Sequence, residues 1–422
     1  MTRALTLPPL APMAIESSSV TSASLHPAAL RGQLDRWLAA HGNDLVAIRR
    51  HIHANPELSH HEFETASYVA RILTAAGLAP RLTGRGNGVL CDIGRGDQVI
   101  ALRADMDALP LHDAKNVPYR STNDGVAHAC GHDVHTTIAL GAGLALAQLD
   151  EQGELPGRIR LVFQPAEESL NSGAPEMIAE GALKDVAAIY ALHVGPWFKT
   201  GQIGVRSGAF TAACDAVEVR LSGLGGHTAR PHLTADLVSA LGRVVTEVPA
   251  LIGRRVDSRA SMSMVFGSIH AGDSFNAIPN EGVAKATIRV LSREAWLSAQ
   301  DLITQLIHEV CAPTGAHVEV KYIRGVPPVI NDRVATSVLS AAAADAIGAD
   351  NVLEAEVSMG GEDFAYYVEQ VPGTMFRLGT AISGYEGKMD IHQAHFDVDE
   401  KCIGVGVRTM VHTATQALRA EF

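Results

Sequence analysis

The stretch HACGHDVHTT (residues 128–137) places Cys130 two positions before His132, and His135 three positions further on. Thiolates and imidazoles are ligands for divalent cations such as Zn²⁺, and they also suit Co²⁺ and Ni²⁺. The same residues permit a second interpretation, in which Cys130 is a nucleophile paired with His132 or His135. A third interpretation is a buried cysteine beside a helix start, with no chemical role. The other motifs of the chain have to decide among these three.

Four further motifs place polar side chains at the ends of predicted strands. These motifs are RADMD (103–107), PAEES (165–169), ALHVG (191–195) and HQAHFD (392–397). Taken alone, His193 would be a core histidine, and Asp105 a helix cap or a turn residue. An α/β sheet builds its site outside the carboxyl ends of its strands, so we expect the motifs to meet there.

The adjacent pair Glu167 and Glu168 gives the strongest reason to expect a metal. Two neighbouring carboxylates at the end of an apolar strand repel each other and lose hydration unless a positive charge lies nearby. A cation supplies that charge, and one glutamate can coordinate it while the other accepts a proton from bound water. A cysteine nucleophile would leave both glutamates, His193 and His395 without a purpose. The sequence therefore favours a metal site.

Most of the chain alternates between strands and helices. Apolar strands are predicted at 88–94, 98–106, 157–164 and 187–195, and helices near 34–54, 62–77, 136–149 and 402–420. Strands that are apolar on both faces indicate a parallel α/β sheet. Residues 31–205 and 326–422 are accordingly predicted to form one large α/β domain that carries the site.

Residues 206–325 follow a different pattern. The segments 215–223, 282–292 and 317–323 alternate polar and apolar residues, which is typical of half-exposed antiparallel strands. Helices are expected at about 234–253 and 293–311. The resulting β-α-β-β-α-β order predicts a small ferredoxin-like α+β domain inserted into the larger one.

Composition excludes several other classes of protein. The chain has 422 residues, 47% hydrophobic and 19% charged, and a net charge of −12 without a basic cluster. Nucleic-acid binding needs clustered positive charge and is not expected. The longest apolar stretch, 136–149, is too short to span a membrane, so no membrane association is expected. Five dispersed cysteines fit a reducing, cytoplasmic location, and residues 1–30 are interpreted as a flexible leader.

Seven motifs, in chain order, resemble those of the M20 metallopeptidase family. They are RADMDALP, ACGHDVH, PAEE, ALHV, GGHTARPH, SMGGEDF and HQAHFD. The resemblance is to the amidohydrolase branch, which contains hippurate hydrolases, auxin-conjugate (indole-acetyl amino acid) hydrolases and N-acetyl-diaminopimelate deacetylases. It implies a catalytic domain with two divalent metal ions. It also implies that the inserted domain forms a homodimer, with a tetramer as the alternative.

The resemblance further implies a role for each motif residue. Cys130 would be shared by both metals, Glu167 would be the general base, and Asp105 would orient a ligand. Each metal would have two further ligands, His132 and His193 for one and Glu168 and His395 for the other. The metals would be Zn²⁺ or Mn²⁺, with Co²⁺ and Ni²⁺ as alternatives.

Three residues of the inserted domain are implied to act on the substrate. His227, in GGHTARPH, would come from the partner subunit and stabilise the tetrahedral oxyanion. Asn276 and Arg289 would hold the free carboxylate of the substrate, for which the planar fork of arginine is suited. The resemblance assigns no catalytic role to Glu362 or Asp363 in GGEDF.

These features predict a metal-dependent hydrolase that cleaves the amide bond of N-acyl amino acids, of the aminoacylase or hippurate hydrolase type. An alternative enzyme is a dinuclear metallo-dipeptidase or carboxypeptidase acting on peptide bonds. A binding protein that kept the fold but lost the metal is the remaining alternative, and the complete ligand set argues against it. The acyl group and the amino-acid preference do not follow from the sequence.

Overall fold

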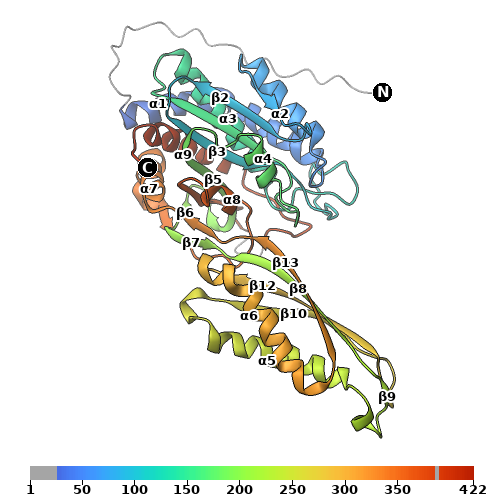
Figure 1. Cartoon of the computed structure of the whole chain (residues 1–422). Coiled ribbons are helices and arrows are strands. Elements are labelled where there is room, and N and C mark those ends of the chain that lie inside the picture. The colour runs from blue at the N-terminus through green and yellow to red at the C-terminus, as the bar shows by residue number, and fades with distance from the viewer. Residues whose placement is uncertain (1–25, 385–388) are drawn as a thin grey trace. The chain divides into compact units, whose positions relative to one another are not determined.

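The computed structural model describes residues 26–384 and 389–422 and divides into two compact units (Figure 1). The first unit comprises the described residues up to Gly208, Asn331–Glu356 and Tyr366–Phe422, and the second comprises Ala209–Ile330 and Val357–Ala365. Residues 1–25 of the predicted leader lie outside the described residues, and its last residues belong to a helix that begins at Pro27. No helix within the described ranges is long and apolar enough to cross a membrane.

The first unit is built on a mixed sheet accompanied by helices. The helices are α1 (Pro27–Ala54), α2 (Phe63–Ala75), α3 (His132–Glu151), α4 (Ala174–Ala179), α7 (Arg333–Ile347), α8 (Ala365–Val368) and α9 (Cys402–Ala417). The strands, in order across the sheet, are β1 (Arg81–Leu82), β2 (Val89–Gly94), β4 (Arg158–Gln164), β3 (Val99–Asp105), β5 (Val186–Lys199), β16 (Gly373–Ala381), β6 (Ile203–Val205) and β15 (Val352–Glu354).

The centre of this sheet is parallel, but its flanks are not. Strands β4, β3, β5 and β16 run parallel, whereas β2 pairs antiparallel with β4, and β6 pairs antiparallel with β16. The prediction of a parallel sheet is therefore wrong for these flanks. A strand buried on both faces is apolar throughout whether it pairs parallel or antiparallel with its neighbour, so the sequence pattern does not reveal its direction.

Helix α3 is buried along nearly its whole length. Gly143 lets it approach β4, since a Cβ at this position would lie 2.4 Å from Leu161 Cδ1. The sequence predicts a helix over 136–149, but the structure begins it at His132. His132 and His135 therefore belong to its first turn, and a packed helix holds their side chains.

In the second unit the main elements are, in chain order, β8 (Ala213–Ser222), α5 (Leu237–Arg255), β10 (Ser263–His270), β12 (Glu281–Val290), α6 (Arg293–Cys311) and β13 (His317–Val326). This is the β-α-β-β-α-β order of a ferredoxin-like domain. The strands form an antiparallel sheet in the order β10-β12-β8-β13, and its buried side chains pack with α5 and α6 in one apolar cluster. Two short strands, β9 (Gly226–His227) and β11 (Ala277–Ile278), pair as a ribbon. Strands β7 (Gly208–Thr211) and β14 (Val329–Asn331) occupy the points where the chain passes between the units.

Residues Val357–Ala365 pack with the second unit, although the sequence pattern assigns them to the large domain. Ser358 O accepts a hydrogen bond from Ala212 N (2.9 Å), and Ser358 N donates to Phe210 O (2.9 Å). Gly361 permits a close approach, since a Cβ there would lie 2.9 Å from Cys214 Cβ. Contacts between such distant stretches leave no local pattern in the sequence.

Candidate metal centre

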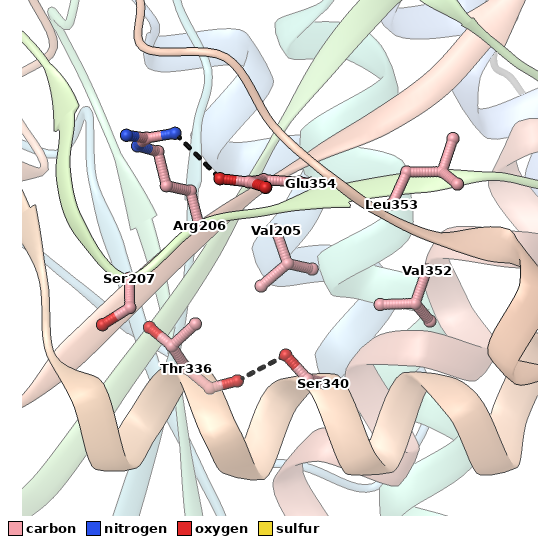
Figure 2. A pocket seen from close by; sticks show the side chains of 8 residues that line it. All are labelled: Val205, Arg206, Ser207, Thr336, Ser340, Val352, Leu353 and Glu354. Atoms are coloured by element: carbon pink, nitrogen blue, oxygen red, sulfur yellow. Dashed lines mark hydrogen bonds and ion pairs between the residues drawn. The ribbon is translucent and has the colours of Figure 1, made fainter.

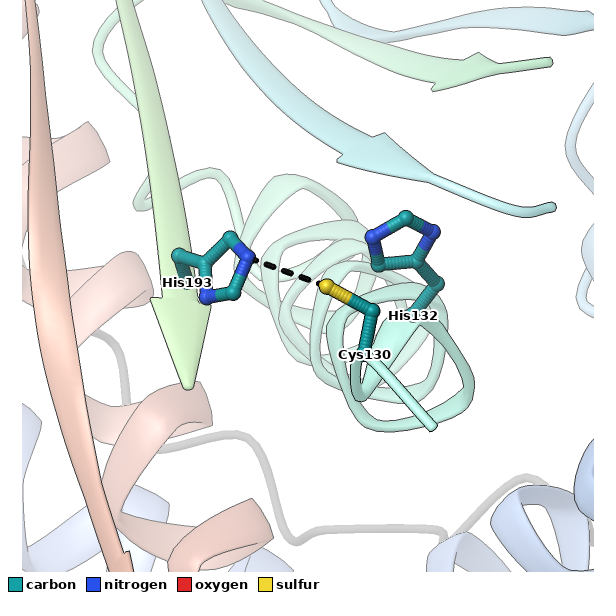
Figure 3. A group of neighbouring side chains, drawn as sticks. All are labelled: Cys130, His132 and His193. Atoms are coloured by element: carbon teal, nitrogen blue, oxygen red, sulfur yellow. Dashed lines mark hydrogen bonds between the residues drawn. The ribbon is translucent and has the colours of Figure 1, made fainter. Parts of the chain in front are cut away.

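The turn that begins α3 positions Cys130 and His132. Gly131 lies between them with a φ of 92°, a left-handed conformation that glycine adopts without steric cost. A Cβ on Gly131 would also lie 2.6 Å from Val194 Cγ2. The turn brings Cys130 Sγ to 3.4 Å from Nε2 of His193, which extends from β5 (Figure 3). Cys130, His132 and His193 are all buried.

Both imidazoles direct Nε2 toward the centre. His132 Nδ1 lies 2.9 Å from Asp107 O and 3.2 Å from Asp107 Oδ1, and His193 Nδ1 lies 2.8 Å from Val194 O. Nδ1 of each ring donates to these oxygens, so Nε2 of each ring can bind either a cation or a second proton. His132 Nε2 is buried, with no hydrogen-bond partner among the described residues.

Negative charge dominates this centre. Burial lowers the pKa of His132, but Asp105 and neighbouring carboxylates outweigh burial and raise this pKa to about 10. Burial and the carboxylate of Glu168 raise the pKa of the Cys130 thiol well above its ordinary value. A divalent cation would displace the proton from each of these ligands. The donor set of thiolate, imidazole and carboxylate therefore fits a metal of the zinc class.

Glu167 and Glu168 follow β4, and their side chains are 10% and 13% exposed. Glu167 Oε2 lies 3.8 Å from His132 Nε2. Glu168 N donates to Asp107 Oδ2 (2.9 Å), and Glu168 Oε1 lies 3.1 Å from Nε2 of His392. The two adjacent glutamates thus reach different parts of the centre.

Two of the candidate ligand groups found among the described residues contain Cys130. One group is Cys130, His132 and His193, and the other is Cys130, Glu168 and His392. Within each group the ligand atoms lie within 4.8 Å of one another. The thiolate of Cys130 would therefore be a ligand in either group.

His392 belongs to the candidate group with Cys130 and Glu168, whereas His395 was the predicted ligand from this loop. His392 has a φ of 62°, which is uncommon for a residue with a Cβ, and its N donates to Ala129 O (2.7 Å). Both His392 and His395 are exposed, but His395 joins none of the candidate metal groups found in the described ranges. Both histidines lie in an irregular loop, where no periodicity tells which side chain points inward.

Two aspartates orient the ligands, whereas the sequence analysis named only Asp105 for this role. Asp105 accepts hydrogen bonds from His135 Nδ1 (2.7 Å) and Arg103 Nη1 (2.7 Å). His135 Nε2 in turn accepts from Val194 N (2.9 Å), so this chain of bonds fixes the backbone next to His193. Asp107 contacts His132 directly, as described above.

A buried ionic network behind the centre was missed by the sequence analysis. Arg49 of α1 is 1% exposed and donates from Nε to Asp133 Oδ2 (2.7 Å) and from Nη2 to Asp397 Oδ1 (2.8 Å). Asp133 follows His132, and Asp397 closes the loop of His392. Arg49 therefore ties two ligand-bearing segments to one helix. An arginine in an amphipathic helix is normally expected in solvent, so its pattern gave no indication of this.

In the second unit, the structure brings His227 and Asn276 together. His227 on β9 pairs with Ala277 on β11, and Thr228 N donates to Asn276 O (3.2 Å). Both side chains are exposed.

Arg289 lies far from this ribbon within the same unit. It pairs with Cys214 near one end of β12, whereas the ribbon continues from the other end, at Glu281 (Figure 1). The eight residue-to-residue steps from Glu281 to Arg289 span about 26 Å in an extended strand. Within one chain Asn276 and Arg289 therefore lie far apart, and their joint role on the substrate carboxylate stays a prediction.

A cavity of about 430 Å³ in the first unit is separate from these groups (Figure 2). It is lined by Val205, Arg206, Ser207, Thr336, Ser340, Val352, Leu353 and Glu354. Arg206 Nη1 donates to Glu354 Oε1 (3.2 Å), and Ser340 Oγ donates to Thr336 O (2.8 Å). None of the predicted site residues lines this cavity.

Comparison with known proteins places the chain in a family. The model of peptidase family M20/M25/M40 matches residues 101–416. The chain belongs to this family. N-acetyl-L-cysteine deacetylase of Bacillus subtilis is 36% identical to it over 361 residues, which cover 85% of this chain and 84% of that protein. A Rhodococcus jostii protein, described provisionally as a glutamate–cysteine ligase, is 44% identical over 368 residues, or 87% of this chain, but this chain spans only 46% of its length.

A solved structure agrees with the family assignment. A Bacillus subtilis protein, described as a dinuclear metal binding peptidase from the M20 family, superposes with a TM-score of 0.79 and 31% sequence identity. The match covers 90% of the M20 chain described here and 99% of that protein. The resemblance of the seven motifs to the amidohydrolase branch of M20 is thereby confirmed.

Proposed function

We propose that this M20 protein is a metal-dependent amidohydrolase that cleaves N-acyl amino acids to a carboxylic acid and a free amino acid. The observation that carries the proposal is the pair of ligand groups sharing Cys130, with the carboxylate of Glu167 beside them. The relative named as N-acetyl-L-cysteine deacetylase supports an N-acyl amino acid as the class of substrate.

The centre would hold two divalent metal ions, Zn²⁺ or Mn²⁺, with Co²⁺ and Ni²⁺ as alternatives. His132 and His193 would bind one ion, Glu168 and His392 would bind the other, and Cys130 would bind both. When bound, the ions lower the pKa of a water molecule and polarise the acyl carbonyl. Asp105 and Asp107 keep the imidazoles in place.

Glu167 is the proposed general base. Its Oε2 lies 3.8 Å from His132 Nε2, beside the two candidate groups that share Cys130. It takes the proton of the attacking water and delivers it to the nitrogen of the leaving amine.

The proposed active form is a dimer in which the second unit of one chain serves the centre of its partner. His227 would stabilise the oxyanion, and Asn276 and Arg289 would hold the substrate carboxylate. The separation of about 26 Å along β12 supports this arrangement, since Asn276 and Arg289 can meet only if they come from different chains. The edge strand β10 also exposes Val265 (62%) and Ile269 (46%), an apolar edge that a second copy would cover.

A second candidate function is a dinuclear dipeptidase or carboxypeptidase. The solved relative described as a peptidase favours it. Preference for a dipeptide with a free amino group over its N-acyl counterpart would identify this activity.

The test is hydrolysis of acetyl, benzoyl and indole-acetyl amino acids by protein stripped of metal and reloaded with Zn²⁺, Mn²⁺ or Co²⁺. We expect metal-dependent release of free amino acid. Glu167→Gln should keep both metals and lose nearly all turnover, because the amide cannot accept the proton. Cys130→Ser should lower the metal content. Hydrolysis that needs no metal, or that is confined to free-amino dipeptides, would refute the proposal.

A further inference from the structure

Glu62 is a buried carboxylate that lies next to the centre but belongs to none of its ligand groups. Its side chain is 0% exposed at the start of α2. Oε1 accepts hydrogen bonds from Ala166 N (2.8 Å) and His60 N (2.9 Å), and Oε2 accepts from Asn87 Nδ2 (3.2 Å). Both oxygens of the Glu62 carboxylate thus accept hydrogen bonds, and one of the three donors belongs to the loop of Glu167.

Ala166 holds a backbone conformation that needs support. Its φ is 56°, in the left-handed region that residues with a Cβ rarely adopt. The peptide groups on its two sides are both held, since Ala166 N donates to Glu62 and Ala166 O accepts from Gly173 N (3.0 Å). The left-handed turn at Ala166 determines the direction in which the next residue, Glu167, leaves β4.

A second carboxylate holds the other side of Glu167. Glu168 N donates to Asp107 Oδ2 (2.9 Å), and the same oxygen accepts from Ser59 Oγ (2.6 Å). The backbone N–H groups before and after Glu167 are thus each bound to a buried carboxylate. The segment 57–62 contributes to both sides: Glu62 accepts from Ala166 N, and Ser59 donates to Asp107, which accepts from Glu168 N.

We propose that Glu62 is a positioning residue for Glu167. It holds the left-handed turn at Ala166 and so directs the carboxylate of Glu167 at the centre. This inference rests on the proposed function of Glu167 as the general base. It adds a residue for which the sequence analysis had no role.

Glu57 provides a matched control. It lies in the same segment and also binds backbone donors, Glu64 N (3.1 Å) and Thr65 N (2.8 Å), together with Thr65 Oγ1 (2.8 Å). These groups belong to the first turn of α2 and do not touch the Glu167 loop. Glu57→Ala should therefore weaken the fold locally without moving Glu167.

The conservative variant separates hydrogen bonding from charge. Glu62→Gln can still accept from Ala166 N and His60 N, and its amide N–H can donate to Asn87 Oδ1 once the Asn87 amide turns over. Asn87 Oδ1 has no hydrogen-bond partner among the described residues, so it is available for this bond. We expect Glu62→Gln to behave like the wild-type protein.

The experiment compares Glu62→Ala, Glu62→Gln and Glu57→Ala in metal-loaded protein. A misplaced catalytic group costs about 10- to 100-fold, so Glu62→Ala should lower kcat by that factor while KM and metal content stay near wild-type values. Glu57→Ala should leave kcat unchanged. Hydrogen exchange of the peptide spanning Ala166 should quicken in Glu62→Ala only.

Two kinetic outcomes would overturn the inference. One is an equal loss of kcat in Glu62→Ala and Glu57→Ala, and the other is an unchanged kcat in Glu62→Ala. If the wild-type protein hydrolyses no substrate, the proposed function fails. Hydrogen exchange of the peptide spanning Ala166 then remains as the test of whether Glu62 holds the turn. Unchanged exchange in Glu62→Ala would reject its role in holding the turn.

Discussion

Replacement of Gly131 by alanine tests whether the turn before α3 builds the centre. The variant meets two separate obstacles. Its φ of 92° strains any residue with a Cβ, and the new Cβ would lie 2.6 Å from Val194 Cγ2. Val194 follows His193, so relief of this contact by movement would separate His193 from Cys130, which now lie 3.4 Å apart.

Gly153, just beyond the other end of α3, is a control that has only the backbone strain and no steric contact. Its φ is 72°, but nothing lies within 4 Å of a Cβ built there. Gly153→Ala should therefore cost only the left-handed strain, about 1–2 kcal/mol. Gly131→Ala should cost this strain plus about 1–3 kcal/mol for overpacking against Val194.

Urea unfolding of the metal-free and metal-loaded protein measures both terms. We expect Gly131→Ala to lose more stability than Gly153→Ala in either form, and it alone should bind metal more weakly. Adding Val194→Ala to Gly131→Ala removes the obstructing methyl groups and should recover part of the metal affinity. Equal losses in the two glycine variants, with equal metal binding, would refute the steric reasoning.

Three other predictions concern particular side chains. His392→Ala should lower metal content whereas His395→Ala should not, as metal analysis of the purified variants will show, and the reverse result would restore His395 as the ligand. Burial lowers the pKa of His412 from 6.5 to about 4, so between these pH values the unfolded chain binds a proton that the native protein does not, and native stability falls as the pH drops. Urea unfolding at pH 7 and pH 4.5 should show that His412→Leu removes up to about 3 kcal/mol of this loss. An unchanged pH dependence in the variant would contradict this assignment. Arg49→Met should lower the free energy of unfolding by about 3–5 kcal/mol, because it leaves buried carboxylates unpaired. The control Arg50→Met changes a neighbouring side chain that is 48% exposed and should lower it by about 1 kcal/mol or less. Similar losses in the two variants would argue against the buried network.

The chemistry of the centre could be read from local sequence. Cys130 and His132 are two positions apart, and Glu167 and Glu168 are adjacent, so their proximity needs no long-range information. The apolar strand β4 ends just before Glu167 and Glu168, and burial on both of its faces leaves an unbroken apolar run, whereas Cys130 and His132 lie at the start of α3 and follow no strand directly. The alternation of polar and apolar residues likewise predicted β8 and β12.

Only the tertiary structure decided which distant groups complete the centre. The contact of His392 with Glu168, the ion pair of Arg49 with Asp397 and the contact of Glu62 with Ala166 all join segments that are far apart in the chain. Periodicity reports which face of an element is buried, but it does not report what that face meets. A polar residue appears in the sequence as a surface residue until folding brings its partner to it, and this is why the sequence assigned no role to Arg49 or Glu62.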